Sequence, residues 1–210
     1  MRPTTRLFAL LTIFVVAALG ACDSTNGAPA ADPSARAEAT PGAVVDSALP
    51  IDVLLGRFRA ITPDSPTVLT GGAESPDRLV RALLAAVSRR DTTALRALVM
   101  SRGEFAWLYY PQSKFTAPPY ALGPDLVWIP MLAASEKGVG RLLSRYGGSA
   151  LRFESLDCPD SIDREGPNEI TSGCTVRFAA ADSAARTIQL FSSLLHRDGR
   201  YKFLSYANDL

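Results

Sequence analysis

A helical pattern of apolar residues begins at Ser75-Pro76-Asp77. Ser75 can cap the first turn, Pro76 suits the first helical position, and Asp77 lies at the positive end of the helix dipole. Up to residue 90, apolar residues then recur on one face: Leu79, Val80, Leu83, Leu84 and Val87. This spacing predicts an amphipathic helix about four turns long.

Further helical patterns follow. Asp91-Thr92 predicts the start of a second short helix, and residues 104–110 continue in helical spacing or as an extended stretch until Pro111. A proline-rich loop covers residues 112–124. Residues 125–146 predict another helix, with a break near Gly138 and Gly140.

Beyond Gly147-Gly148 apolar and polar residues alternate, which is the period of a strand. Four strands are predicted, around residues 151–154, 175–178, 187–190 and 201–203. Asp198-Gly199 is typical of a two-residue hairpin turn, and residues 181–184 predict a second one. Helices followed by antiparallel strands predict an α+β domain.

The N-terminus has the features of an export signal. Arg2 and Arg6 precede an apolar run over residues 7–19, which is too short to span a bilayer. The run ends at Leu19-Gly20-Ala21-Cys22, which resembles the lipobox of bacterial lipoproteins. The resemblance implies a signal peptide over residues 1–21, a lipid on Cys22 that attaches the chain to a membrane, and a domain outside the cytoplasm, in the periplasm. The alternative is an ordinary secretory signal in which Cys22 has no role.

Three further regions follow Cys22. Residues 22–50 are dominated by small and polar residues that cannot bury enough apolar surface to offset their ordering entropy, which predicts a flexible tether. Residues 51–74 predict an irregular segment that packs on the domain, with a short helix or strand over 51–59, or a partner-binding segment. Residues 75–210 then form one domain.

Cysteine count and charge bear on three kinds of site: a disulfide, a metal site and a nucleic-acid-binding surface. Lipidation of Cys22 would leave the even pair Cys158 and Cys174, which we expect to form a disulfide in an oxidising compartment. A metal site needs more ligands than two thiols and the single His196 supply. Without residues 1–21 the chain loses two arginines and keeps 20 basic against 21 acidic residues. This balance provides no electrostatic footprint for nucleic acid.

No sequence motif indicates catalysis, and we predict no catalytic residue, metal or cofactor. His196 stands beside Arg197-Asp198-Gly199 in the predicted hairpin turn, which favours a surface position. The most distinctive feature is a concentration of aromatic residues over residues 105–128. Trp107, Tyr109, Tyr110, Tyr120 and Trp128 either fill the space between helices and sheet or line the mouth of a pocket.

The order of elements over residues 75–207 resembles the nuclear-transport-factor-2-like superfamily. The resemblance rests on the helix over 76–90, the turn Arg90-Asp91-Thr92 and the last strand Tyr201-Lys202-Phe203-Leu204. It implies helices on a curved antiparallel sheet of about four strands that forms a cone, whose open end binds small molecules or carries isomerase or dehydratase chemistry.

Three functions therefore compete. The first is a lipid-anchored binding or interaction domain for a small molecule or an envelope protein. The second is an isomerase or dehydratase, with Tyr109 or Tyr110 as hydrogen-bond donor and Glu104 or Asp125 as base. The third is a structural lipoprotein of an envelope assembly, which a large exposed apolar patch would favour.

Overall fold

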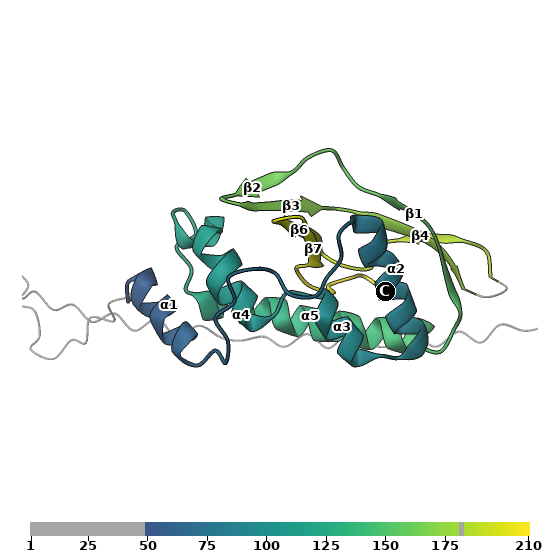
Figure 1. Cartoon of the computed structure of the whole chain (residues 1–210), viewed down its shortest axis with the longest axis horizontal. Coiled ribbons are helices and arrows are strands. Elements are labelled where there is room, and N and C mark those ends of the chain that lie inside the picture. Colours follow the sequence, from purple (N-terminus) through teal and green to yellow (C-terminus); the bar gives the residue numbers. More distant parts are fainter. Residues whose placement is uncertain (1–48, 181–182) are drawn as a thin grey trace, which may run out of the picture. The chain divides into compact units, whose positions relative to one another are not determined.

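The computed structural model describes residues 49–180 and 183–210. The predicted signal peptide, Cys22 and nearly all of the predicted tether lie outside these residues. Within them, helices come first and antiparallel strands follow, so the prediction of an α+β domain is confirmed. Figure 1 shows strands β1 to β4 along one side of the domain and helices α3, α4 and α5 along the other.

The first helices begin and end where their capping residues predict. Helix α2 (Pro76–Arg89) is capped by Ser75, whose Oγ accepts a hydrogen bond from the Arg78 N–H, and it ends at Arg90 in the left-handed conformation. Helix α3 (Thr92–Leu98) is capped by the Asp91 carboxylate, which accepts from the Ala94 N–H. Ahead of them, α1 (Ile51–Ala60) shows that residues 51–60 pack on the domain as a helix.

The aromatic segment is helical but not α-helical throughout. Helix α4 (Arg102–Glu104) opens with a reciprocal capping box between Ser101 and Glu104. It passes into a π-helix (Phe105–Tyr109) and then into two 3-10 turns (Tyr110–Gln112 and Lys114–Thr116). The wider π-turn brings the Phe105 and Tyr110 rings to 5.5 Å between centroids.

Helix α5 (Pro124–Tyr146) is continuous, so the predicted break near Gly138 and Gly140 is wrong. The two glycines have different surroundings. A Cβ on Gly138 would lie 1.7 Å from the Tyr206 carbonyl oxygen, whereas a Cβ on Gly140 would meet nothing within 4 Å. Gly138 is therefore required for a close approach of the C-terminal segment to α5, and it does not interrupt the helix.

Residues 49–180 and 183–210 form seven strands in two antiparallel sheets, where the sequence predicts four strands. The first sheet has the order β1-β4-β5, and the second has the order β2-β3-β6-β7. Their bounds are β1 Leu151–Asp157, β2 Asp163–Glu165, β3 Asn168–Ser172, β4 Thr175–Ala180, β5 Arg186–Ile188, β6 Ser193–Arg197 and β7 Arg200–Phe203. The described residues contain no closed barrel.

One of the two predicted turns is confirmed. Asp198 and Gly199 both have positive φ, 50° and 74°, and join β6 to β7. This is the backbone that a two-residue hairpin with right-handed twist requires. The other predicted turn, at residues 181–184, includes two residues outside those that the structure describes.

The predicted disulfide between Cys158 and Cys174 is present. It joins the end of β1 to the residue before β4, and the hairpin of β2 and β3 lies within the loop that it closes. The disulfide therefore closes the base of the loop that carries β2 and β3, and β3 pairs with β6 in the second sheet.

Replacing both Cys158 and Cys174 by Ala should lower the free energy of unfolding by about 3 kcal/mol, because a loop of this length gains much entropy when it opens in the unfolded chain. Urea unfolding followed by circular dichroism measures the change. The native protein with its disulfide reduced should unfold at the same urea concentration as the variant; equal stability of oxidised protein and variant would contradict the prediction.

Two apolar clusters form the interior. The larger one lies between α2, α3, the second half of α5 and both sheets. The smaller one contains Phe58 of α1, Phe105, Trp128 and, from the second sheet, Ile170 and Leu195. The aromatic segment therefore supplies a core of its own beside the main one.

Candidate functional site

The five aromatic residues singled out from the sequence fall into two groups. Tyr109, Tyr110 and Trp128 are buried in the smaller core, where Phe105 contacts all three at centroid distances of 5.1 to 6.0 Å. Trp107 and Tyr120 are exposed. The π-helix produces this division in part, since it turns Trp107 outward between the buried side chains of Ala106 and Leu108.

The exposed aromatic rings have partners on the surface. The Arg59 guanidinium lies 4.0 Å from the Trp107 ring centroid, and its Nε donates a hydrogen bond to the Ala106 carbonyl. Tyr120 packs edge-on against Phe115 with 5.6 Å between centroids. Ligand binding by Trp107 or Tyr120 stays a prediction.

The buried tyrosines are held in their neutral form. Burial raises the pKa of Tyr109 above its usual range, and the nearby Glu165 carboxylate raises it further. Burial also raises the pKa of Tyr110, whose hydroxyl donates to the Leu122 carbonyl. The Tyr110 hydroxyl therefore holds the proline-rich loop in place.

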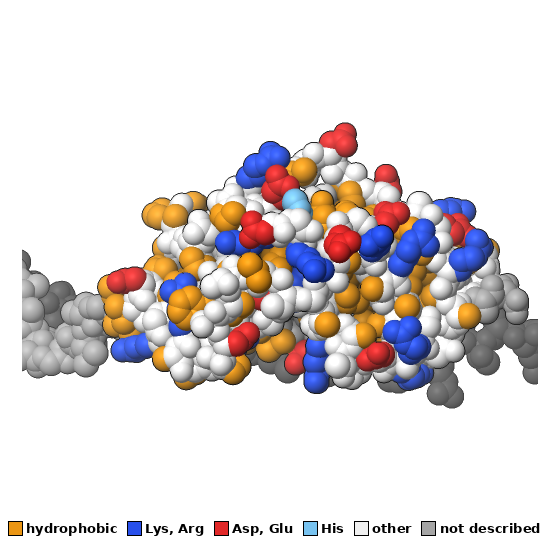
Figure 2. All heavy atoms as spheres, viewed as in Figure 1, with side chains coloured by type: hydrophobic (Ala, Val, Ile, Leu, Met, Phe, Trp, Pro, Cys, Tyr) orange, Lys and Arg blue, Asp and Glu red, His pale blue; other side chains and the backbone are white. Residues whose placement is uncertain are grey.

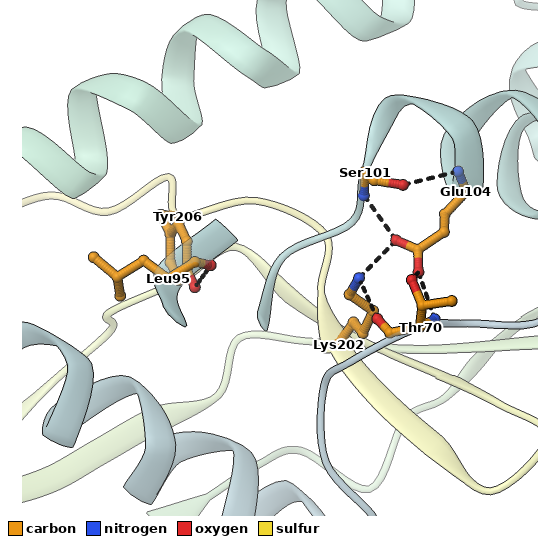
Figure 3. A network of polar contacts seen from close by, with 6 residues as sticks. All are labelled: Thr70, Leu95, Ser101, Glu104, Lys202 and Tyr206. Atoms are coloured by element: carbon orange, nitrogen blue, oxygen red, sulfur yellow. Dashed lines mark hydrogen bonds and ion pairs between the residues drawn. The ribbon is translucent and has the colours of Figure 1, made fainter. Parts of the chain in front are cut away.

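Glu104 lies in the most densely connected polar cluster of the described chain (Figure 3). Its Oε2 accepts from the Lys202 Nζ at 2.7 Å and from the Ser101 N–H at 2.8 Å. Its Oε1 accepts from the Thr70 N–H at 2.8 Å. The Lys202 ammonium also donates to the Thr70 carbonyl at 2.9 Å. Both charged side chains are buried, with 0% of Glu104 and 2% of Lys202 exposed.

This cluster joins three distant parts of the chain and has no features of a catalytic base. A general base needs a free lone pair within reach of a substrate proton, whereas the Glu104 carboxylate is occupied by an ammonium and two backbone donors. Asp125, the other carboxylate considered, is exposed in the first turn of α5. The pockets on the surface of α5 are lined by other residues. The structure therefore places neither carboxylate in one of them beside Tyr109 or Tyr110.

His196 lies on strand β6 and not in the turn that follows it. Its Nδ1 is 2.9 Å from the Glu169 Oε2, and its ring stacks on Tyr201 with 4.3 Å between centroids. Arg164 binds the other Glu169 oxygen at 3.1 Å. Hydrogen bonds from His196 and then Arg164 lower the pKa of Glu169 from its usual value.

The lowered pKa of Glu169 predicts a small loss of stability in acid. A carboxylate whose pKa is lower in the folded than in the unfolded chain stabilises the fold at every pH above the pKa of the unfolded chain. This stabilisation is lost as the pH falls through the pKa of the folded chain. Unfolding midpoints of the native chain and of Glu169→Gln should therefore differ at neutral pH and converge as the pH falls through the lowered pKa of the folded Glu169. A constant difference over this range would contradict the assignment.

The outer face of α5 changes character along the helix. In the first half it exposes the apolar side chains of Leu126 (66% exposed), Ile129 (61%) and Leu132 (40%), together with Pro130 and Ala133. We call these five residues the apolar face. In the second half the outer positions are Glu136, Lys137, Gly140, Ser144 and Arg145, which is the polar composition expected of a solvated helix.

A groove adjoins the apolar face. It lies between α3 and α5, has a volume of about 260 Å³, and is lined mainly by apolar side chains, with one basic and one acidic residue. Leu95 and Val99 line it from the α3 side, Leu132 and Val139 from α5, and Tyr206 from the C-terminal segment. Leu132 therefore belongs to both the groove and the apolar face.

Elsewhere the surface has mixed charge. Acidic and basic side chains are interspersed on the face seen in Figure 2, and several form exposed ion pairs, such as Arg177 with Glu154. Residues 49–180 and 183–210 contain no group of three or more His, Cys, Asp or Glu side chains placed to hold a metal ion. In the same residues no helix has the length and apolar character to cross a membrane.

Comparison with known proteins gives no match. The chain fits no family model and resembles no curated protein or solved structure at a significant level. Its function is therefore inferred from its own residues.

Proposed function

We propose that this chain is a lipid-anchored protein of the bacterial cell envelope that binds a partner protein through the apolar face of α5 and the adjoining groove. The observation that carries the proposal is the exposure of Leu126, Ile129 and Leu132 on consecutive turns of one helix. Apolar patches of this kind on a soluble domain mark interaction sites. The predicted lipid on Cys22 and the tether over residues 22–50 would hold the domain close to a membrane.

Charge favours a protein over a lipid surface as the occupant of the apolar face. Asp125 and Glu136 are exposed at its two ends and balance the basic neighbours Lys137 and, in the groove, Arg96, so the surface has no excess of basic residues. A surface that docks on anionic lipid carries basic residues beside its apolar ones. The groove can accept one or two large apolar side chains, which is how a partner segment anchors at an interface.

In-cell photo-crosslinking tests this proposal. A photoreactive phenylalanine analogue at position 129 should yield a discrete protein adduct, and the same analogue at Ser144, on the polar half of the outer face, should not. Ile129→Gln should abolish co-purification of the adducted protein while leaving the free energy of unfolding unchanged within about 0.5 kcal/mol, as expected for a surface substitution. A lipid adduct, an adduct with a second copy, or no adduct at position 129 would overturn the proposed partner.

The anchor makes a separate prediction. Cys22→Ala should release the chain from the membrane fraction, because a lipid on this cysteine is the proposed attachment. Fractionation with metabolic labelling by a radioactive fatty acid measures both effects, and Cys158→Ala serves as the control that keeps its label. Membrane attachment and labelling of the Cys22→Ala chain would contradict the lipoprotein assignment.

The proposal includes the nuclear-transport-factor-2-like fold as the finer description of the domain. The capped turn at Asp91 between α2 and α3, and the packing of α2 on β1, support it. The division of the strands into two sheets departs from a single curved sheet. Isomerase chemistry is not proposed, because Glu104 is committed to Lys202 and Asp125 is exposed.

A further inference from the structure

A second pocket lies at the opposite end of α5 from the apolar face. It has a volume of about 310 Å³ and is bordered by the last turn of α5, the segment after it, and strands β4 and β5. Its lining includes Arg145, Tyr146, Ser149, Phe178, Ser183 and Arg186. The described lining therefore combines two guanidinium groups, two aliphatic hydroxyls and a phenol with an aromatic wall.

Among the described residues that line this pocket, the charged side chains are both basic. Neither Arg145 nor Arg186 forms an ion pair with another residue in the described part of the chain. A guanidinium presents a planar set of donors that matches the two oxygens of a carboxylate or phosphate. The pair is therefore suited to an oxyanion.

Tyr146 provides an independent indication that this pocket binds a ligand. Its side chain is 5% exposed, and its hydroxyl is a buried polar atom without a hydrogen-bond partner among the described residues. Leaving such a group unpaired is unfavourable, and buried polar groups are otherwise almost always bonded. A ligand oxygen that reached this hydroxyl from the pocket that Tyr146 lines would supply the missing acceptor.

The wall of the pocket favours an organic anion over a bare ion. The rings of Tyr146 and Phe178 meet edge to face at 5.2 Å between centroids, and Ala180 extends the apolar surface. The negative end of the α5 dipole opposes an anion here. However, the carbonyls of Leu143, Tyr146 and Gly147 already accept hydrogen bonds, from the Gly147 and Ser149 N–H groups and from Arg90.

A neighbouring hollow shows the contrast. It has about 390 Å³ and contains Lys137 and Arg141, but it also contains Asp209, and the Arg141 guanidinium donates to the Asn208 carbonyl. This hollow therefore combines its two basic side chains with an acidic one, and one of its guanidiniums already binds a backbone carbonyl. The pocket at Arg145 and Arg186 has no such internal compensation among its described lining residues.

We propose that the pocket formed by Arg145, Tyr146, Ser149, Ser183 and Arg186 binds a small organic anion, a carboxylate or a phosphate ester with a short apolar body. The two guanidiniums would bind the anionic head, the hydroxyls would donate to its remaining oxygens, and Phe178 would contact its body. This site is separate from the proposed protein-binding face and does not depend on it.

Calorimetric titration of the full chain with benzoate and with phenyl phosphate distinguishes the two head groups, and benzamide is the uncharged control. At least one of the two anions should bind, with benzamide at least about tenfold weaker. Arg145→Gln and Arg186→Gln should each weaken binding at least about tenfold, as expected for a charge-assisted hydrogen bond. Arg200→Gln, which removes the same charge at the exposed β6–β7 hairpin, should leave the affinity unchanged.

Tyr146→Phe separates a binding role from a structural one. Because the hydroxyl has no partner to lose, the unfolding midpoint of the free protein should stay the same or rise, while affinity falls about threefold to tenfold. No binding of either anion at millimolar concentration, or undiminished binding by the Arg145→Gln, Arg186→Gln double variant, would overturn the proposal.

Discussion

Replacing Lys202 by Met should lower the free energy of unfolding by about 3 to 5 kcal/mol, because the substitution strands the buried Glu104 carboxylate without its counterion. For a domain of this size, each kcal/mol shifts the midpoint of thermal unfolding by about 2 to 4 °C, so the expected decrease is roughly 6 to 20 °C. Urea and thermal unfolding, followed by circular dichroism, measure it.

A double variant distinguishes the lost ion pair from lost packing. Glu104→Gln combined with Lys202→Met leaves no buried charge, and the Gln carbonyl can still accept from the Thr70 or the Ser101 N–H. It should therefore be more stable than Lys202→Met alone. A loss below about 1 kcal/mol in the single variant, or a double variant less stable than the single, would contradict the view that an unpaired charge dominates.

Gly138→Ala should be destabilising by more than about 3 kcal/mol, beyond the usual range for added core volume. The added Cβ would lie 1.7 Å from the Tyr206 carbonyl oxygen and 2.6 Å from its carbon, and neither backbone atom can move as a flexible side chain would. The C-terminal segment would have to leave α5, which would also break the hydrogen bond from the Asn208 side chain to the Gly138 carbonyl.

Gly140→Ala is the matched control, two residues away on the same helix. Nothing lies within 4 Å of its added Cβ, and Gly140 is exposed. Since Ala is favoured over Gly inside a helix, this variant should be more stable than the native chain by about 0.5 to 1 kcal/mol. Equal effects of the two substitutions in urea unfolding would contradict the assigned role of Gly138.

Features that depend on neighbouring residues could be predicted from the sequence. Ser75 and Asp91 cap helices, and Asp198-Gly199 forms a hairpin, because each acts on backbone atoms within three residues of itself. The disulfide could be predicted because the lipobox sets Cys22 apart and leaves one pair of cysteines.

Features that depend on distant contacts could not be predicted. Strand β3 was not predicted because one of its inward positions is occupied by the polar residue Asn168. The Asn168 side chain is buried and donates to the Leu108 carbonyl, 60 residues away. Gly138 resembled a helix breaker because the backbone that requires it lies at Tyr206. Glu104 looked available for catalysis because its partner is Lys202, 98 residues further along the chain.

The two candidate binding surfaces could not be predicted either, because they too depend on contacts between distant residues. The apolar face belongs to a helix whose pattern is apolar on all sides in its first half, so the sequence alone does not reveal which side lacks a partner. The anion pocket joins residues of α5 with residues of β4 and β5, and no local motif connects them.

Strand β7 also determines when the domain can close during synthesis. Its residues complete contacts made much earlier in the chain: Tyr201 pairs with Ala73, Phe203 pairs with Val99, and Lys202 neutralises Glu104. A ribosome makes Lys202 98 residues after Glu104, so a nascent chain that has not reached β7 has a carboxylate without its counterion and an unfilled core. Contacts of such long range slow folding. The domain should consequently stay open during translation until β7 has been synthesised.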